Sequence, residues 1–210
     1  MTSPRPLSNS AVPPAIGANA ASLSEAERAR FEHARQHILA QELRSAIEGK
    51  LHDLIARNPT RMNYQERFER LIADYNAGSL NVQQFFDQLL VLTRDLNAED
   101  KRHIAEELNE EQFAIFDLLT RPNVSLSERD RQQVKRVARD LLETLKREKL
   151  VLDWKKHQAA RAAVKVAIEQ VLDKELPDAY TPDLYAQKCD QVFQHICDSY
   201  ADATHSIYAA

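Results

Sequence analysis

Glycine is scarce in this chain of 210 residues, which contains only Gly17, Gly49 and Gly78. That scarcity disfavours folds built on glycine-rich turns, such as sandwiches, dinucleotide-binding units and phosphate loops. Neither G-x-x-x-x-G-K-[ST] nor G-x-G-x-x-G occurs in the sequence, so the nucleotide sites that those motifs form have no counterpart here. We therefore expect no cofactor in this chain.

Long hydrophobic runs are also lacking. No apolar stretch approaches the ~20 residues that a membrane-spanning helix needs, and the N-terminus has no apolar core of the signal-peptide kind. Hydrophobic residues make up 43% and charged residues 29% of the chain, which is ordinary for a soluble folded protein. We expect a cytoplasmic protein without membrane contact.

Only two cysteines are present, Cys189 and Cys197. They lie eight residues apart in a segment that we expect to be helical, so about 12 Å separates them along the axis. A disulfide needs Cα atoms within ~7 Å, which makes pairing between them unfavourable. His195 lies between them, but these offsets do not gather three metal ligands on one helix face. We expect two buried or half-buried thiols and no metal site.

Catalytic motifs are missing or incomplete. A magnesium-dependent nuclease needs an Asp followed by Glu-x-Lys on adjacent strands. Glu48-Gly49-Lys50 matches the triplet but no Asp precedes it, and Glu99-Asp100-Lys101 lies at an expected helix start with no strand nearby. G-x-S-x-G and H-E-x-x-H do not occur. We expect the chain not to be catalytic by itself.

Hydrophobic periodicity predicts an all-α fold. Residues 1–22 carry four of the eight prolines and no hydrophobic period, which predicts a disordered leader. Apolar residues then recur at helical spacing, and proline, glycine and capping residues separate the segments. We expect a single all-helical domain over 23–205, an irregular bundle of seven or eight helices, over about 24–57, 63–77, 81–97, 98–107, 110–120, 127–148, 153–174 and 181–200.

Capping patterns and apolar stripes support these boundaries. Ser24 and Glu27 form a capping-box pattern at the start of the first helix, and Gly78 follows the second helix as its C′ residue. The apolar side of the first helix is expected to carry Phe31, Ala34, Ile38, Ile47, Leu51 and Leu54.

Positive charge concentrates in one region although the chain is acidic overall, with 28 Lys and Arg against 32 Asp and Glu. Residues 121–165 hold 13 basic and six acidic residues, a local charge of +7. On the expected 127–148 helix, the basic side chains cover the arc opposite the apolar stripe. The candidate contacts to DNA or an acidic partner are Lys135, Arg136, Arg139, Lys146 and Arg147, followed by Lys155 and Lys156. The alternative is a solvated face with ion pairs between neighbouring turns.

The 153–174 helix is expected at the centre of the bundle because it is apolar nearly all round. Trp154, Arg161 and Ile168 are seven residues apart and share one stripe. A buried Arg161 would require a carboxylate, a carbonyl or a ligand phosphate, since an unpaired buried charge is very costly. Trp154 and Arg161 are therefore candidates for a buried polar or ligand contact, and both a structural pairing and a ligand remain open for Arg161.

Several stretches together resemble the C-terminal helical domain of type I restriction enzyme R subunits. They span about residues 24–200 and are Arg57-Asn58-Pro59-Thr60-Arg61, Tyr64–Asn76 (YQERFERLIADYN), Phe116–Leu119, Val134–Lys146 (VKRVARDLLETLK), Leu152-Asp153-Trp154, 161–168, Leu176-Pro177 and Tyr180-Thr181. In that family the R subunit is the motor and nuclease of a restriction–modification complex. Its nuclease domain and helicase lobes have no counterpart in this chain.

The resemblance implies a non-catalytic assembly and docking module. Its implied partners are the methyltransferase and motor subunits of a type I restriction complex, with DNA near the 121–165 region. A free-standing helical DNA-binding or regulatory protein is the alternative. A split subunit, an isolated domain and a gene remnant are all compatible with the missing motor segments.

Overall fold

The regular elements of the described residues are all helices, apart from one isolated bridge, which confirms the predicted all-α class. The computed structural model describes residues 24–122 and 124–209, so the predicted leader at 1–22 lies outside the described residues. The described helices are α1 (Glu25–Arg57), α2 (Met62–Asn76), α3 (Val82–Asp100), α4 (Arg102–Ala105), α5 (Glu110–Thr120), α6 (Glu128–Glu148), α7 (Gln158–Glu175) and α8 (Pro182–Ser199), with two short 3₁₀ helices, η2 (Pro59–Arg61) and η3 (Trp154–Lys156).

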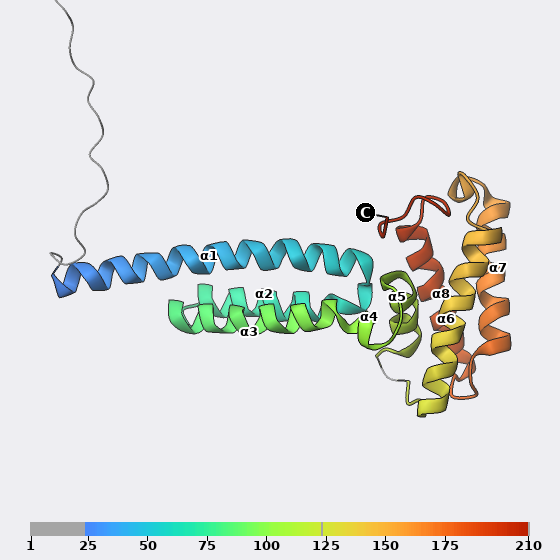
Figure 1. The fold of residues 1–210 in the computed structure, drawn as a ribbon, viewed down its shortest axis with the longest axis horizontal. Coiled ribbons are helices and arrows are strands. Elements are labelled where there is room, and N and C mark those ends of the chain that lie inside the picture. The colour runs from blue at the N-terminus through green and yellow to red at the C-terminus, as the bar shows by residue number, and fades with distance from the viewer. Residues whose placement is uncertain (1–23, 123, 210) are drawn as a thin grey trace, which may run out of the picture.

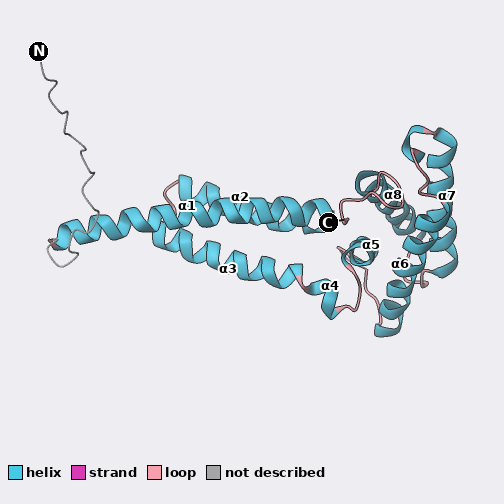
Figure 2. Ribbon diagram, turned by 45° about the horizontal axis from the view of Figure 1, so that its top comes forward, coloured by secondary structure: helices cyan, strands magenta, loops and turns pink. Residues whose placement is uncertain are grey.

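Two groups of helices make up the fold. Helices α1, α2 and α3 run side by side as an elongated arm, and α6, α7 and α8 form a body across one end of it (Figure 1). Helix α5 lies between the two groups, as the turned view also shows (Figure 2). The described residues form two separate hydrophobic clusters, one in the arm and one in α5–α8 with its loops. That a single domain spans 23–205 stays a prediction.

The arm is held together by the face of α1 that contacts α2 and α3. Ser24 begins α1 with the predicted capping box, in which its side chain accepts from the Glu27 amide. Residues of α1 at helical spacing are buried against the α2–α3 hairpin. The buried apolar residues of the arm are Ala40, Ile47, Leu51, Leu54, Phe68, Leu71, Val82, Phe85, Leu89, Leu92 and Leu96.

Three of the six residues expected on the apolar side of α1 do not join this core, which corrects the prediction that one side carries them all. Phe31 is 64% exposed and Ile38 is 60% exposed, and Ala34 is also exposed. From Phe31 to Ile47 an α-helix rotates by a net angle of about 160°, so the two sets lie on nearly opposite faces. Helix α1 also extends beyond the α2–α3 hairpin (Figure 1). Phe31, Ala34 and Ile38 form what we call the outer stripe.

The turn between α2 and α3 follows the prediction at Gly78. Its φ of +75° is the left-handed conformation that glycine adopts at no steric cost. The Gly78 amide donates to the Tyr75 carbonyl (3.0 Å) and the Ser79 amide to the Asp74 carbonyl (2.9 Å). This Schellman pattern ends α2 and lets α3 return along α1.

The core of the body also includes α5, which packs with α6, α7 and α8 in one hydrophobic cluster. Its buried members include Phe113, Val134, Trp154, Ile168 and Ile196. Helix α7 begins at Gln158 rather than near residue 153, because Trp154 belongs to the separate 3₁₀ helix η3. Only one side of α7 is buried, through Val164, Ala167, Ile168 and Leu172. The expectation of a central α7 buried on all sides is therefore wrong.

The last residues return toward the arm. Tyr200 and Ser206 form an isolated antiparallel bridge, and the Ala203 amide donates to the Leu150 carbonyl (2.8 Å). The Tyr208 hydroxyl donates to the Arg57 carbonyl at the end of α1. This segment thereby ties the body to the arm. None of the described helices has the length and apolar character that crossing a membrane would require.

Candidate functional site

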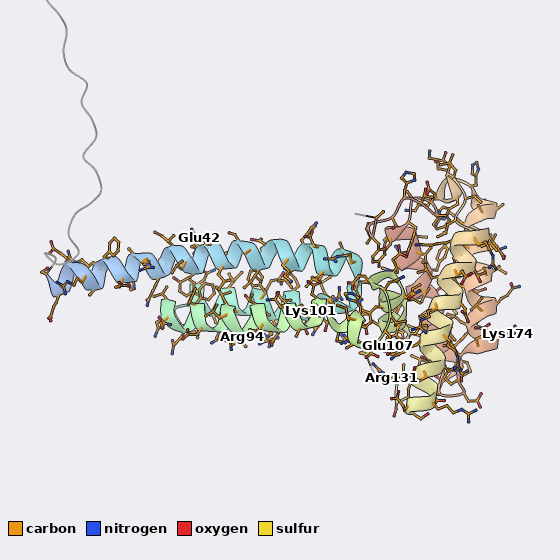
Figure 3. The ribbon with its side chains drawn as sticks, viewed as in Figure 1. Glu42, Arg94, Lys101, Glu107, Arg131 and Lys174 are labelled. Carbon is orange, nitrogen blue, oxygen red and sulfur yellow. The ribbon has the colours of Figure 1, made fainter. Side chains whose placement is uncertain are left out.

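The basic residues predicted on α6 are largely occupied by acidic groups of the chain itself. Lys135 Nζ lies 2.8 Å from Glu106 Oε2, and Arg131 pairs with the same carboxylate. Arg139 donates to the Glu107 carbonyl (2.7 Å). Figure 3 labels Glu107, which follows Glu106 in the chain, and Arg131 of α6. Burial by itself would raise the pKa of the Glu106 carboxyl, but the hydrogen bonds from Lys135 and Arg131 lower that pKa below its ordinary value.

Farther along α6, Lys146 Nζ lies 2.5 Å from Glu111 Oε2, so it also faces α5. Arg147 is exposed and pairs with Glu148 (2.8 Å). Arg136 is exposed, and no ion pair is found for it among the described residues. The basic side chains on this face of α6 thus join the helix to the 106–111 segment. Contact of these residues with DNA or a partner stays a prediction.

Trp154 and Arg161, predicted on one stripe as candidates for a buried polar or ligand contact, differ in their surroundings. Trp154 is fully buried, and its indole Nε1 has no hydrogen-bond partner among the described residues. Arg161 is exposed, which corrects the prediction that it is buried. Because α7 starts only at Gln158, Arg161 lies in its first turn beside an open groove instead of inside a helix layer.

That groove, which we call the α7 groove, has a volume of about 520 Å³. It lies where η3, the start of α7 and α8 meet. Lys155 and Lys156, both predicted contacts, line it together with Arg161. The structure therefore brings three of the predicted site residues together in one place. The full lining is Lys155, Lys156, Gln158, Arg161, Ala162, Lys165 and Phe193.

A buried ionic network at the junction of arm and body was missed by the sequence analysis. Arg61 Nε donates to Glu99 Oε1 (3.3 Å), and Arg61 Nη1 donates to Glu110 Oε1 (2.5 Å). Arg102 bridges Glu99 (2.8 Å) and Asp117 (2.6 Å). Arg61, Glu99 and Asp117 are all buried. The network joins η2, α3, α4 and α5, so it fixes how the arm meets the body.

Asp117 was the one signal for this network in the sequence. It stands inside FAIFDLLT, an otherwise apolar run of α5, where a charge must find partners once the helix is buried. Asn58 Nδ2 donates to Asp117 Oδ2 (3.1 Å), and the Thr60 hydroxyl donates to the same oxygen (3.3 Å). Asn58 also caps η2 by accepting from the Thr60 amide (3.1 Å).

Beside this network lies a hollow of about 670 Å³ between η2 and α8. Its lining includes Thr60, Leu118, Arg121 and His195. His195 is buried, and its Nε2 lies 2.9 Å from the Tyr208 hydroxyl. The Ser199 hydroxyl lies 3.3 Å from its Nδ1. At this buried, hydrogen-bonded position the neutral imidazole is favoured over the charged imidazolium.

Acid should destabilise the fold through His195. Burial lowers the pKa of its imidazole to about 4, with Asp198 opposing the shift, whereas an unfolded histidine titrates near 6.5. Between these values the unfolded chain binds more protons. The contribution of the neutral His195 to the free energy of unfolding is therefore complete above pH ~6.5. As the pH falls to ~4, up to about 3 kcal/mol of it is lost.

Urea unfolding at pH values above and inside that window measures the effect. His195→Gln retains a hydrogen-bonding side chain without the titration, so its loss of stability on acidification should be smaller than that of the unaltered chain. Equal losses in the two proteins would contradict the assignment to His195.

The two cysteines are free thiols, with Cys189 buried and Cys197 partly buried. Burial raises the pKa of both thiols. Within residues 24–122 and 124–209, no group of three or more His, Cys, Asp or Glu side chains is arranged to hold a metal ion.

Comparison with known proteins identifies relatives of nearly the whole chain. A family model described as "Type I restriction enzyme HindI endonuclease subunit-like, C-terminal" matches residues 18–201. A protein of Methanocaldococcus jannaschii described as "Putative type I restriction enzyme MjaIXP endonuclease subunit" is 24% identical over 183 residues, which cover 85% of this chain. The chain spans only 17% of that relative's length. No solved structure matches the chain.

Proposed function

We propose that this chain is a non-catalytic docking module of a restriction–modification system. The chain belongs to the family of type I restriction enzyme HindI endonuclease subunit-like C-terminal regions. The restriction-system role rests on the family membership, because the family model covers most of the chain. The relative named as an endonuclease subunit is far longer than this chain. We assign DNA cleavage to segments of such subunits beyond the aligned part.

The observation that carries the docking role is the outer stripe of α1. Phe31, Ala34 and Ile38 are spaced i, i+3 and i+7, so they share one face, and that face points away from the core of the arm. Large side chains grouped in this way are typical of interaction surfaces. The spacing fits the apolar face of a second helix, as in helix-to-helix docking.

We propose the methyltransferase subunits of the same system as the occupant of the outer stripe. The junction network links the arm to the body through α5, so docking of the arm would also position the body. The motor part of the endonuclease subunit would then be placed against the methyltransferase without any chemistry in this chain.

Phe31→Ser combined with Ile38→Ser should weaken binding to the purified methyltransferase at least tenfold. Burying one large apolar side chain contributes about 1.5–3 kcal/mol, and the two serines remove this from the interface. Because both residues are exposed, the free energy of unfolding should change by less than about 0.5 kcal/mol each. Surface plasmon resonance with immobilised methyltransferase measures the affinity.

A matched control exists in the body. Val151 and Leu152 are also apolar and exposed, and Leu152 reaches 77% exposure. Val151→Ser with Leu152→Ser should leave the affinity unchanged. If both double variants bind equally well, the outer stripe is not the docking surface.

A further inference from the structure

The α7 groove collects positive charge that other groups of the chain neutralise only in part. Four of its lining residues are cationic, and they come from η3 and the first two turns of α7 (Lys155, Lys156, Arg161 and Lys165). On α6, by contrast, Lys135 and Lys146 are engaged by Glu106 and Glu111. Arg136 of α6 is exposed as well, but the groove gathers four cations of the 121–165 region around one cavity.

Two carboxylates approach the groove. Asp153 Oδ1 lies 2.7 Å from Lys156 Nζ, and Asp190 Oδ1 lies 2.9 Å from Lys165 Nζ. Both aspartates are exposed, and exposed ion pairs of this kind are weak enough for a competing anion to displace. No ion pair is found for Lys155 or Arg161 within the described residues. The groove keeps an excess of two positive charges.

The arrangement of these cations is unfavourable for the isolated chain. Arg161 and Lys165 are four residues apart on α7, so two like charges lie on adjacent turns, where they repel each other. The N-cap residue of α7, His157, makes no side-chain hydrogen bond to the first turn, and the positive end of the helix dipole adds to the same field. A bound anion would relieve both effects.

Aromatic surface accompanies the charge. Phe193 of α8 lines the groove, with Lys165 Nζ 6.0 Å from the centre of its ring. Proteins contact the backbone, sugars and bases of nucleic acids with lysine and arginine side chains placed beside an aromatic surface. A bound acidic peptide would need partners for its own amide groups, and Gln158 is the one amide side chain in the lining. The lining therefore favours a polyphosphate.

We propose that the α7 groove binds phosphate groups of the DNA backbone, independently of sequence. Arg161 supplies a planar donor that can contact one phosphate through two N–H groups, while Lys155 and Lys165 act as point charges beside it. This surface is separate from the outer stripe of α1, so the docking proposal and the DNA proposal can fail independently.

Binding of the full chain to a fluorescent random-sequence duplex, measured by anisotropy over a range of KCl concentrations, tests the proposal. Each lost phosphate contact lowers the magnitude of the slope of log K against log salt by about 0.9. Arg161→Ala with Lys165→Ala should reduce affinity at least tenfold at low salt and lower that slope by about 2. Lys155→Ala, which lies outside α7, should lower it by about 1.

The control is a second double variant that removes two exposed positive charges elsewhere. Arg94 lies on α3 in the arm, and Lys174 lies near the other end of α7, at the outer side of the body (Figure 3). Arg94→Ala with Lys174→Ala should leave the slope unchanged. Equal losses in the two double variants would overturn the proposal, as would an unchanged slope in the groove variants. Displacement of the labelled duplex by polyglutamate at a lower concentration of charge than an unlabelled duplex needs would instead assign the groove to an acidic protein.

Discussion

Arg61→Ala should lower the free energy of unfolding by about 3–5 kcal/mol, because removing one partner of a buried ion pair leaves the other charge without compensation. Arg61 is fully buried at the junction of arm and body. Besides Glu99 and Glu110 it donates to the Leu54 carbonyl (3.3 Å). Arg102 still reaches Glu99 in the variant, so we expect the lower part of that range.

Arg67→Ala is the matched control. Arg67 also belongs to the arm, and its Nη1 lies 2.6 Å from Asp95 Oδ2. This pair is largely exposed, so its loss should cost no more than about 1 kcal/mol. Guanidinium unfolding followed by circular dichroism measures both variants, and the fluorescence of Trp154, the single tryptophan, reports on the body separately. Similar costs for the two variants would contradict a special role for the buried network.

Trp154→Ala should also cost about 3–5 kcal/mol, since it removes the largest fully buried side chain and leaves a cavity in the core of the body. The indole nitrogen has no hydrogen-bond partner within the described residues, so Trp154 contributes through packing and not through a polar contact. Trp154→Phe therefore loses volume alone and should cost clearly less than the alanine variant.

Thermal unfolding followed by circular dichroism compares these two variants with Leu152→Ala. Leu152 lies two residues away and is exposed, so its truncation should change stability by no more than about 0.5 kcal/mol. If Trp154→Phe is as damaging as Trp154→Ala, the indole nitrogen makes a contact that the packing argument leaves out.

The local features of the fold could be predicted from the sequence because they depend on neighbouring residues. The capping box of Ser24, the turn at Gly78 and the end of α5 before Pro122 all follow from interactions within a few residues. Periodicity likewise predicted which segments are helices. It did not predict what each face contacts, since a helix with two apolar faces can bury either one.

The misplaced outer stripe illustrates this limit. Phe31 and Ile47 each belong to an apolar face of α1, and only the position of α3 decides which of the two faces is covered. Charge patterns share the limit. The basic arc of α6 was indistinguishable from a free surface until Glu106 and Glu111 were found against it.

The candidate site was predictable in composition but not in place. Lys155, Lys156 and Arg161 were recognised from local charge and spacing, and Lys165 lies one turn after Arg161 on α7. Phe193 joins them only because α8 packs beside α7. Because the chain breaks between η3 and α7, Arg161 lies at the surface and not at the core position that we expected. No motif in the sequence marks that break.

Docking onto a methyltransferase is the central claim, and light scattering during size-exclusion chromatography tests it most directly. The chain has a mass of 24.0 kDa. Mixed at micromolar concentration with the purified methyltransferase of its own restriction system, it should elute as one species whose mass exceeds that of the methyltransferase by a whole multiple of this value. The Phe31→Ser, Ile38→Ser variant should elute separately. Elution of the unaltered chain at its own mass beside an unaltered methyltransferase peak would contradict the account.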